Sequence, residues 1–266
     1  MRKMKNLLLC IAATLLLSSC TSLYKPNMIQ SPMLTEKGDF NVSGALGISG
    51  MGNGHVQTAY APVEHLGIML NMMGHSESPW YSQETQKLQI LNGEAGIGIH
   101  NKFGSKNNLL LQVYAGYGRG RSVNYIDNNS PESRPEMSSN FSSLFFQPGI
   151  AYVGDLMNVA VDFRFKRVTM FDLNARLYRE FEWWNTEYEF FNNSSVAFGL
   201  FEPVVTFKIG DENYRGIFQA GLNIPIANTD NYYTVNPYEF FGLSFMKVGI
   251  GFEYSINTNR KTKANQ

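Results

Sequence analysis

Apolar and polar residues alternate with a period of two in several parts of this chain. The clearest case is residues 157–166, where the apolar residues are Met157, Val159, Val161, Phe163 and Phe165. Asn158, Asp162, Arg164 and Lys166 occupy the positions between them, and the same alternation recurs in residues 40–48, 218–226 and 248–256. Because successive side chains of a strand point to opposite faces, this period predicts strands with one apolar and one polar face.

Similar segments predict about ten strands along the chain. They lie near residues 38–49, 55–61, 66–75, 87–101, 108–122, 141–153, 157–171, 195–209, 215–226 and 238–257. Their connections are alternately short and long, apart from a short first connection at 50–54. Short turns on the periplasmic side and long loops outside are typical of outer-membrane barrels. The sequence therefore predicts an all-β fold, a single antiparallel up-and-down β-barrel of about ten strands of the outer-membrane type.

The polar face of the predicted strands carries charged residues. These charges distinguish a membrane barrel from a soluble β-protein. A lipid-tethered soluble β-protein would show the same alternation, but a sealed soluble core would not tolerate so many charges. We expect these side chains to face the lumen and to pair with one another, because an unpaired buried charge is costly. The expected lumen network is Glu94, Asp162, Arg164, Lys166 and Glu202. The low charged fraction of 17% and the aromatic fraction of 14% favour the membrane barrel.

The N-terminus has the pattern of a bacterial lipoprotein signal. Arg2, Lys3 and Lys5 precede an apolar run over residues 7–17, which is followed by Ser18, Ser19 and Cys20. The expected organisation is a lipoprotein signal peptide at 1–19, a lipid-anchored linker at 20–37, the barrel at 38–257 and a polar tail at 258–266. Cys20 would carry fatty acyl groups such as palmitate. It would lie on the periplasmic side of the outer membrane of a Gram-negative bacterium, since both ends of the barrel face the periplasm. The alternative is a plain secretory signal with an incidental cysteine.

Three stretches resemble a group of uncharacterised, lipid-anchored outer-membrane β-barrel proteins of Gram-negative bacteria. They are residues 24–27 (YKPN), residues 31–40 (SPMLTEKGDF) and residues 59–68 (AYAPVEHLGI). The resemblance is strongest over residues 15–75 and implies the fold and the location. It implies no catalytic motif.

The remaining residues give little sign of enzymatic chemistry. No cysteine other than Cys20 follows the signal, and the four histidines lack the spacing of a metal site, so no disulfide, metal or cofactor is expected. His75 with Ser76 or Ser78 is the one candidate for a lipid-hydrolysing pair. After signal removal the chain has 19 basic and 22 acidic residues, which disfavours nucleic acid as a partner. We therefore predict no enzyme and no catalytic residue.

The longest predicted outer connection is 172–194, and its residues 172–193 are rich in aromatic residues. Aromatic rings beside carboxylates suit the recognition of a glycan or a protein ligand. The candidate binding residues are Tyr178, Trp183, Trp184 and Tyr188, and the alternative is a hairpin with no ligand. A barrel of about ten strands is close to the size that side chains fill. We therefore predict a structural or surface-binding role in contact with outer-membrane lipid, rather than a wide porin. A small-solute pore or a lipid-modifying enzyme is the alternative.

Overall fold

The computed structural model describes residues 24–47, 53–77, 85–127, 135–181, 184–228 and 246–258. The strands are β1 (Asp39–Gly47), β2 (Asn53–Val63), β3 (Leu66–Glu77), β4 (Thr85–Phe103), β5 (Leu109–Asp127), β6 (Pro135–Val153), β7 (Met157–Phe181), β8 (Trp184–Gly210), β9 (Tyr214–Leu222), β10 (Ile224–Asn228) and β11 (Met246–Asn257). Within these ranges no helix is long and apolar enough to cross a membrane.

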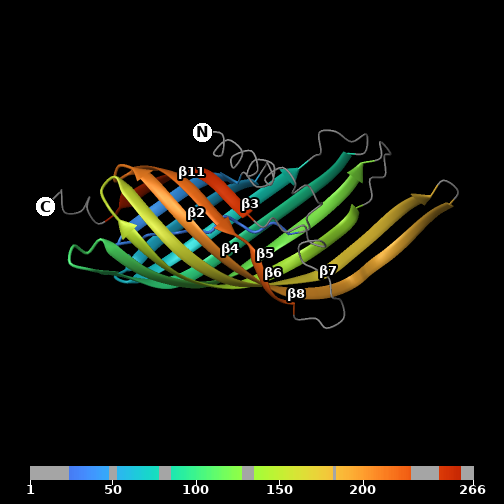
Figure 1. Cartoon of the computed structure of the whole chain (residues 1–266), viewed down its shortest axis with the longest axis horizontal. Helices are drawn as coiled ribbons and strands as arrows, with labels where there is room; N and C mark the ends of the chain where they lie inside the picture. The colour runs from blue at the N-terminus through green and yellow to red at the C-terminus, as the bar shows by residue number, and fades with distance from the viewer. Residues whose placement is uncertain are drawn as a thin grey trace, which may run out of the picture.

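Ten strands close into an antiparallel ring (Figure 1). From β1 to β8 each strand pairs with the next in the chain. β9 pairs with both β8 and β11, and β11 pairs with β1 to complete the ring. This arrangement confirms the predicted all-β fold and its up-and-down topology. β10 lies outside the ring and pairs with the Phe198–Phe201 part of β8.

The two ends of the barrel differ in their connections. Short turns at residues 64–65, 104–108, 154–156 and 211–213 lie at one end, which we call the short-turn mouth. The start of β1 and the end of β11 also lie there, because Asp39 pairs with Asn257. We call the opposite end the long-loop mouth. Its connections at 48–52, 78–84, 128–134, 182–183 and 229–245 fall outside the described residues.

The outer wall of the barrel is apolar on every strand of the ring. One exposed large side chain from each strand illustrates this: Leu46, Val56, Leu70, Ile97, Leu111, Phe146, Phe163, Ile209, Phe218 and Ile250. The charged residues Arg119 and Arg167 also face outward, and both lie closer to the long-loop mouth than the apolar residue named for their strand does. An apolar belt around the whole ring is the surface that a membrane-spanning barrel presents to lipid.

Two segments differ from the sequence-based expectation. The predicted strand 215–226 is divided at Asn223, which is buried, into β9 and β10. The register on β8 also shifts beside Pro225, which has no backbone N–H to donate. The predicted connection 172–194 is largely strand, because β7 and β8 continue to Phe181 and Trp184, which agrees with the alternative of a long hairpin. Beyond Ala175 the described pairing of β7 is with β8 alone, and this hairpin extends past the other strands in Figure 1.

Candidate functional site: the filled lumen

Residues Tyr24–Leu34, which we call the lumen segment, run in extended form through the inside of the barrel. The sequence suggested a linker here. In the structure Tyr24 and Leu34 are fully buried at the two ends of the segment, and Ile29 is 1% exposed between them. The side chain of Met28 occupies the space beside Gly249, where a Cβ atom would collide with it. The centre of the barrel is therefore occupied by the protein's own chain.

Side chains from the barrel wall satisfy the backbone of the lumen segment. A buried extended chain outside a sheet needs other partners for its N–H and C=O groups. The carbonyl oxygens of five consecutive residues, Met28 to Pro32, each accept a hydrogen bond from the wall. The donors are Gln57 (3.1 Å) and Asn71 (3.0 Å) to Met28, Gln219 (2.7 Å) to Ile29, Gln147 (2.8 Å) to Gln30, Lys208 (2.8 Å) to Ser31 and Asn41 (2.7 Å) to Pro32.

Further hydrogen bonds join the lumen segment to the remaining strands of the ring, with the exception of β11. The backbone N–H of Ile29 donates to Gln219 (3.0 Å), and that of Met33 donates to Gln112 (3.2 Å). Asn92 donates to the side chain of Asn27 at 2.9 Å, and the hydroxyl of Ser31 donates to Asp162. Nine of the ten ring strands thus supply a side chain to the segment. This explains why the inward faces are rich in Asn and Gln.

Apolar clusters hold the two ends of the lumen segment. The ring of Tyr24 meets those of Phe141 and Phe198 edge to face, with centroids 5.2 and 5.6 Å apart. At the other end Leu34 packs in a cluster with Ala61 and Tyr114. The segment is therefore fixed by hydrophobic packing at both ends and by polar contacts between them.

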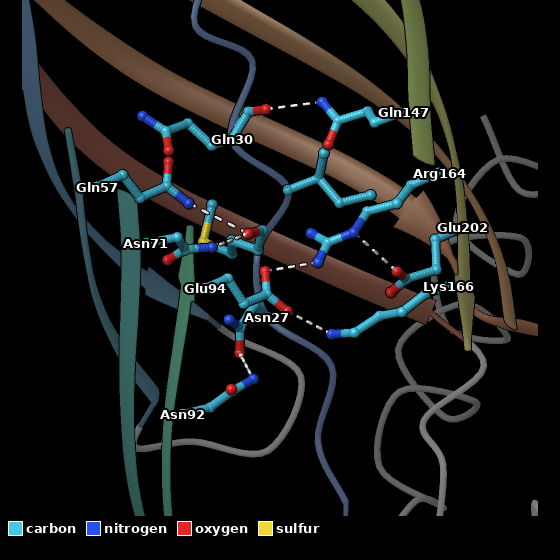
Figure 2. A network of polar contacts seen from close by, with 12 residues as sticks. Asn27, Gln30, Gln57, Asn71, Asn92, Glu94, Gln147, Arg164, Lys166 and Glu202 are labelled. Carbon is cyan, nitrogen blue, oxygen red and sulfur yellow. Dashed lines mark hydrogen bonds and ion pairs between the residues drawn. The ribbon is translucent and has the colours of Figure 1, made fainter. Parts of the chain in front are cut away.

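Charged side chains form a compact group beside the segment, and Figure 2 shows Glu94, Arg164, Lys166 and Glu202 of this group. We call Glu94, Arg164, Lys166, Glu202 and Lys247 the lumen ion cluster. Glu94 lies 2.5 Å from both Arg164 Nη2 and Lys166 Nζ. Glu202 lies 3.5 Å from Arg164 Nε and 2.9 Å from Lys247 Nζ. The Arg164 guanidinium also lies over the ring of Phe145, 4.4 Å from its centroid.

The structure brings four of the five expected lumen residues into one group. Asp162 is also inside the barrel, but its bonds are to Ser31 and Gln112 (2.9 Å) rather than to a cation of the cluster. Sequence reasoning missed Lys247 and a second buried pair, Lys208 with Glu253 at 2.7 Å. The alternation of polar and apolar residues could have identified Lys247 and Glu253 as lumen residues, because both lie on the polar face of the last strand.

The remaining predicted residues are only partly described. Tyr178, Trp184 and Tyr188 lie on the β7–β8 hairpin, where Leu177 pairs with Tyr188, while Trp183 and Cys20 are outside the described residues. His75 is buried in the lumen, whereas the adjacent Ser76 faces outward, so these two side chains lie on opposite sides of the wall. Ser78 is outside the described residues. Where the chain is described, no group of His, Cys, Asp and Glu side chains is arranged to hold a metal ion.

A cavity of about 550 Å³ lies at the short-turn mouth. Its lining includes Asp39, Asn41, Asn158, Arg215 and Glu253, together with Pro32 and Met33 of the lumen segment. The cavity is therefore a vestibule that ends against the segment. On its rim, Asp211 accepts the backbone N–H groups of Asn213 (2.9 Å) and Tyr214 (2.6 Å). These bonds hold the pKa of the Asp211 carboxyl below its ordinary value, since they stabilise the ionised form.

Comparisons with known proteins give weak structural similarity. No protein family and no curated protein matches the chain. CdiB from Acinetobacter baumannii is similar with a TM-score of 0.29 and 9% identity, over 82% of this chain and 59% of CdiB, so the chain spans less than two thirds of that protein. The CymD monoaromatic hydrocarbon channel is similar with a TM-score of 0.29 and 7% identity, over 84% of this chain and 89% of the channel. Similarity this weak carries no functional argument. The barrel is compatible with an outer-membrane location.

Proposed function

We propose that this protein is an outer-membrane lipoprotein barrel that does not conduct as a general porin and acts as a structural or surface-binding element. The observation that carries the proposal is the lumen segment. Nine strands bond to it, and the ion cluster lies beside it, so the interior resembles a packed core more than a water-filled channel. The apolar belt supports residence in a membrane, because an exposed apolar surface of this extent needs a cover.

Surface binding is proposed for the β7–β8 hairpin. Its strands pair with each other beyond the rest of the ring, from Arg176 with Glu189 to Phe181 with Trp184. A two-stranded ribbon that projects past a rigid barrel is a suitable place for ligand recognition, because substitutions in it have little effect on the stability of the barrel. A glycan or a protein ligand at the cell surface is the proposed partner class.

Conductance tests the filled lumen. The wild-type protein, reconstituted in planar lipid bilayers, should show no stable porin-scale conductance. A variant that lacks residues 24–34 but keeps Cys20 should show channels if it folds, because the polar wall then encloses open space. Porin-scale currents from the wild-type protein would refute the proposal, whatever the deletion variant does.

Acylation tests the proposed lipid anchor. Cells that express the wild-type protein and are labelled with a radioactive fatty acid should incorporate label into it, because Cys20 follows the Leu17-Ser18-Ser19 motif. The Cys20→Ala variant should incorporate none. Equal labelling of the two proteins would show that the thiol of Cys20 is not the attachment site.

A further inference from the structure

The direction of the lumen segment can be read from the strands that hold its two ends. The cluster around Tyr24 includes Met73, Leu88 and Phe141, which are near the ends of β3, β4 and β6 that lead to long connections. The cluster around Met33 includes Leu110, Ala151 and Ala160, which lie next to short turns. The segment therefore passes from the long-loop mouth at Tyr24 to the short-turn mouth at Leu34.

The chain then reverses at the short-turn mouth to enter β1. Asp39 accepts the backbone N–H groups of Thr35 (2.8 Å) and Glu36 (2.9 Å), which forms a tight turn. Gly38, with a φ of 86°, adopts the left-handed conformation that glycine tolerates best, and its N–H donates to Ala61. The start of β1 and the start of the lumen segment are consequently at opposite ends of the barrel.

We propose that the chain before Tyr24 leaves the barrel through the long-loop mouth, so that the mature N-terminus is presented on the outer side of the membrane. Cys20 precedes Tyr24 by four residues, a reach of at most about 14 Å. A lipid on Cys20 would then enter the outer leaflet next to the surface loops, whereas reasoning from the ends of the barrel alone places it on the periplasmic side. The position of the lipid rests on the proposed acylation, but the path of the chain does not.

The contacts that hold the segment make this path a fixed part of the fold. Gln219 both donates to and accepts from the backbone of Ile29, as a neighbouring strand would. Lys166 lies over the ring of Tyr24, 5.4 Å from its centroid, which ties the entrance of the segment to the lumen ion cluster. Reversing the segment inside the barrel would break every one of these contacts.

Labelling of single cysteines tests which mouth the N-terminus uses. Ser22→Cys lies just before the lumen segment, Asn129→Cys lies between β5 and β6, and Lys106→Cys lies in the short turn between β4 and β5. With a membrane-impermeant maleimide on intact cells, Ser22→Cys and Asn129→Cys should be labelled, and Lys106→Cys only after permeabilisation. The wild-type protein serves as the blank. If Ser22→Cys behaves like Lys106→Cys, or is never labelled, the proposal is overturned.

A crosslink inside the lumen tests the path independently. In the folded fraction, a short bifunctional thiol reagent should join the pair Asn27→Cys and Asn92→Cys, because the side-chain amides of these two residues are 2.9 Å apart in the structure. The pair Asn27→Cys and Asn158→Cys is the matched control, since Asn158 lines the cavity at the other mouth. Loss of the first crosslink, or equal crosslinking of both pairs, contradicts the path. Neither experiment depends on conductance, so failure here is distinguishable from failure of the proposed function.

Discussion

Replacing Glu94 with Gln is expected to destabilise the folded barrel by about 3–5 kcal/mol, the cost of removing one partner from a buried ion pair. Glu94 is 4% exposed and contacts both Arg164 and Lys166. The lumen ion cluster has three cations and two carboxylates, and Glu94→Gln leaves a single carboxylate for all three cations. Urea titration of the protein refolded in lipid vesicles measures the free energy of unfolding.

The matched control removes a cation together with the carboxylate. The double variant Glu94→Gln/Lys166→Met restores the net charge of the cluster, and Arg164 keeps its contact with Glu202. We expect this variant to recover a substantial part of the lost stability, because the excess positive charge is gone. A double variant no more stable than Glu94→Gln would mean that packing, rather than charge, accounts for the loss.

Replacing Phe163 with Arg is expected to cost about 2–4 kcal/mol of folding free energy in a bilayer, as for an Arg near the midplane on the lipid face. Phe163 is 42% exposed on the outer wall, and its ring stacks on that of Phe201 with centroids 6.3 Å apart. Met157 faces the same way on β7 but lies at the short-turn mouth, roughly 20 Å further along the strand. Met157→Arg should therefore cost only about 0–1 kcal/mol.

The comparison of these two variants separates a membrane barrel from a soluble one. Both place the same charge on the same face of the same strand, so only depth in the bilayer differs. Two measurements compare the variants. The first is the free energy of folding into lipid vesicles, and the second is the yield of heat-modifiable protein in the outer-membrane fraction. If Phe163→Arg and Met157→Arg fold equally well, the apolar belt does not face lipid.

Local alternation was sufficient to predict the barrel wall. In residues 157–166 it indicated which side chains point inward, and Arg164 and Lys166 do lie in the lumen. It also indicated Glu94 and Glu202 as their partners, and both carboxylates lie beside Arg164. It could not indicate that Asp162 bonds to Ser31 instead, because Ser31 belongs to a segment that shows no alternation. It also predicted a continuous strand at 215–226, since alternation there persists across Asn223 although the pairing partner changes.

The lumen segment was not predicted, for a physical reason. Its backbone pairs with side chains rather than with a neighbouring strand, so it needs no period of its own, and Tyr24–Leu34 shows none. A signal was nevertheless present. The stretch contains Met28, Ile29, Met33 and Leu34 and a single charged residue, Lys25, which is too apolar for a solvated linker.

A chain enclosed by its own ring constrains the order in which the protein can form. The β1–β11 seam joins the first strand to the last through nine residue pairs, and it closes the ring around residues that precede β1. Threading an end that carries the proposed lipid through a completed ring would drag acyl chains across a polar interior. We therefore expect the sheet to wrap around the segment while the seam is open, with pairing of β1 and β11 as the final step. Slow seam closure would leave the edges of β1 and β11 unpaired, and these are the surfaces at which newly made chains would aggregate.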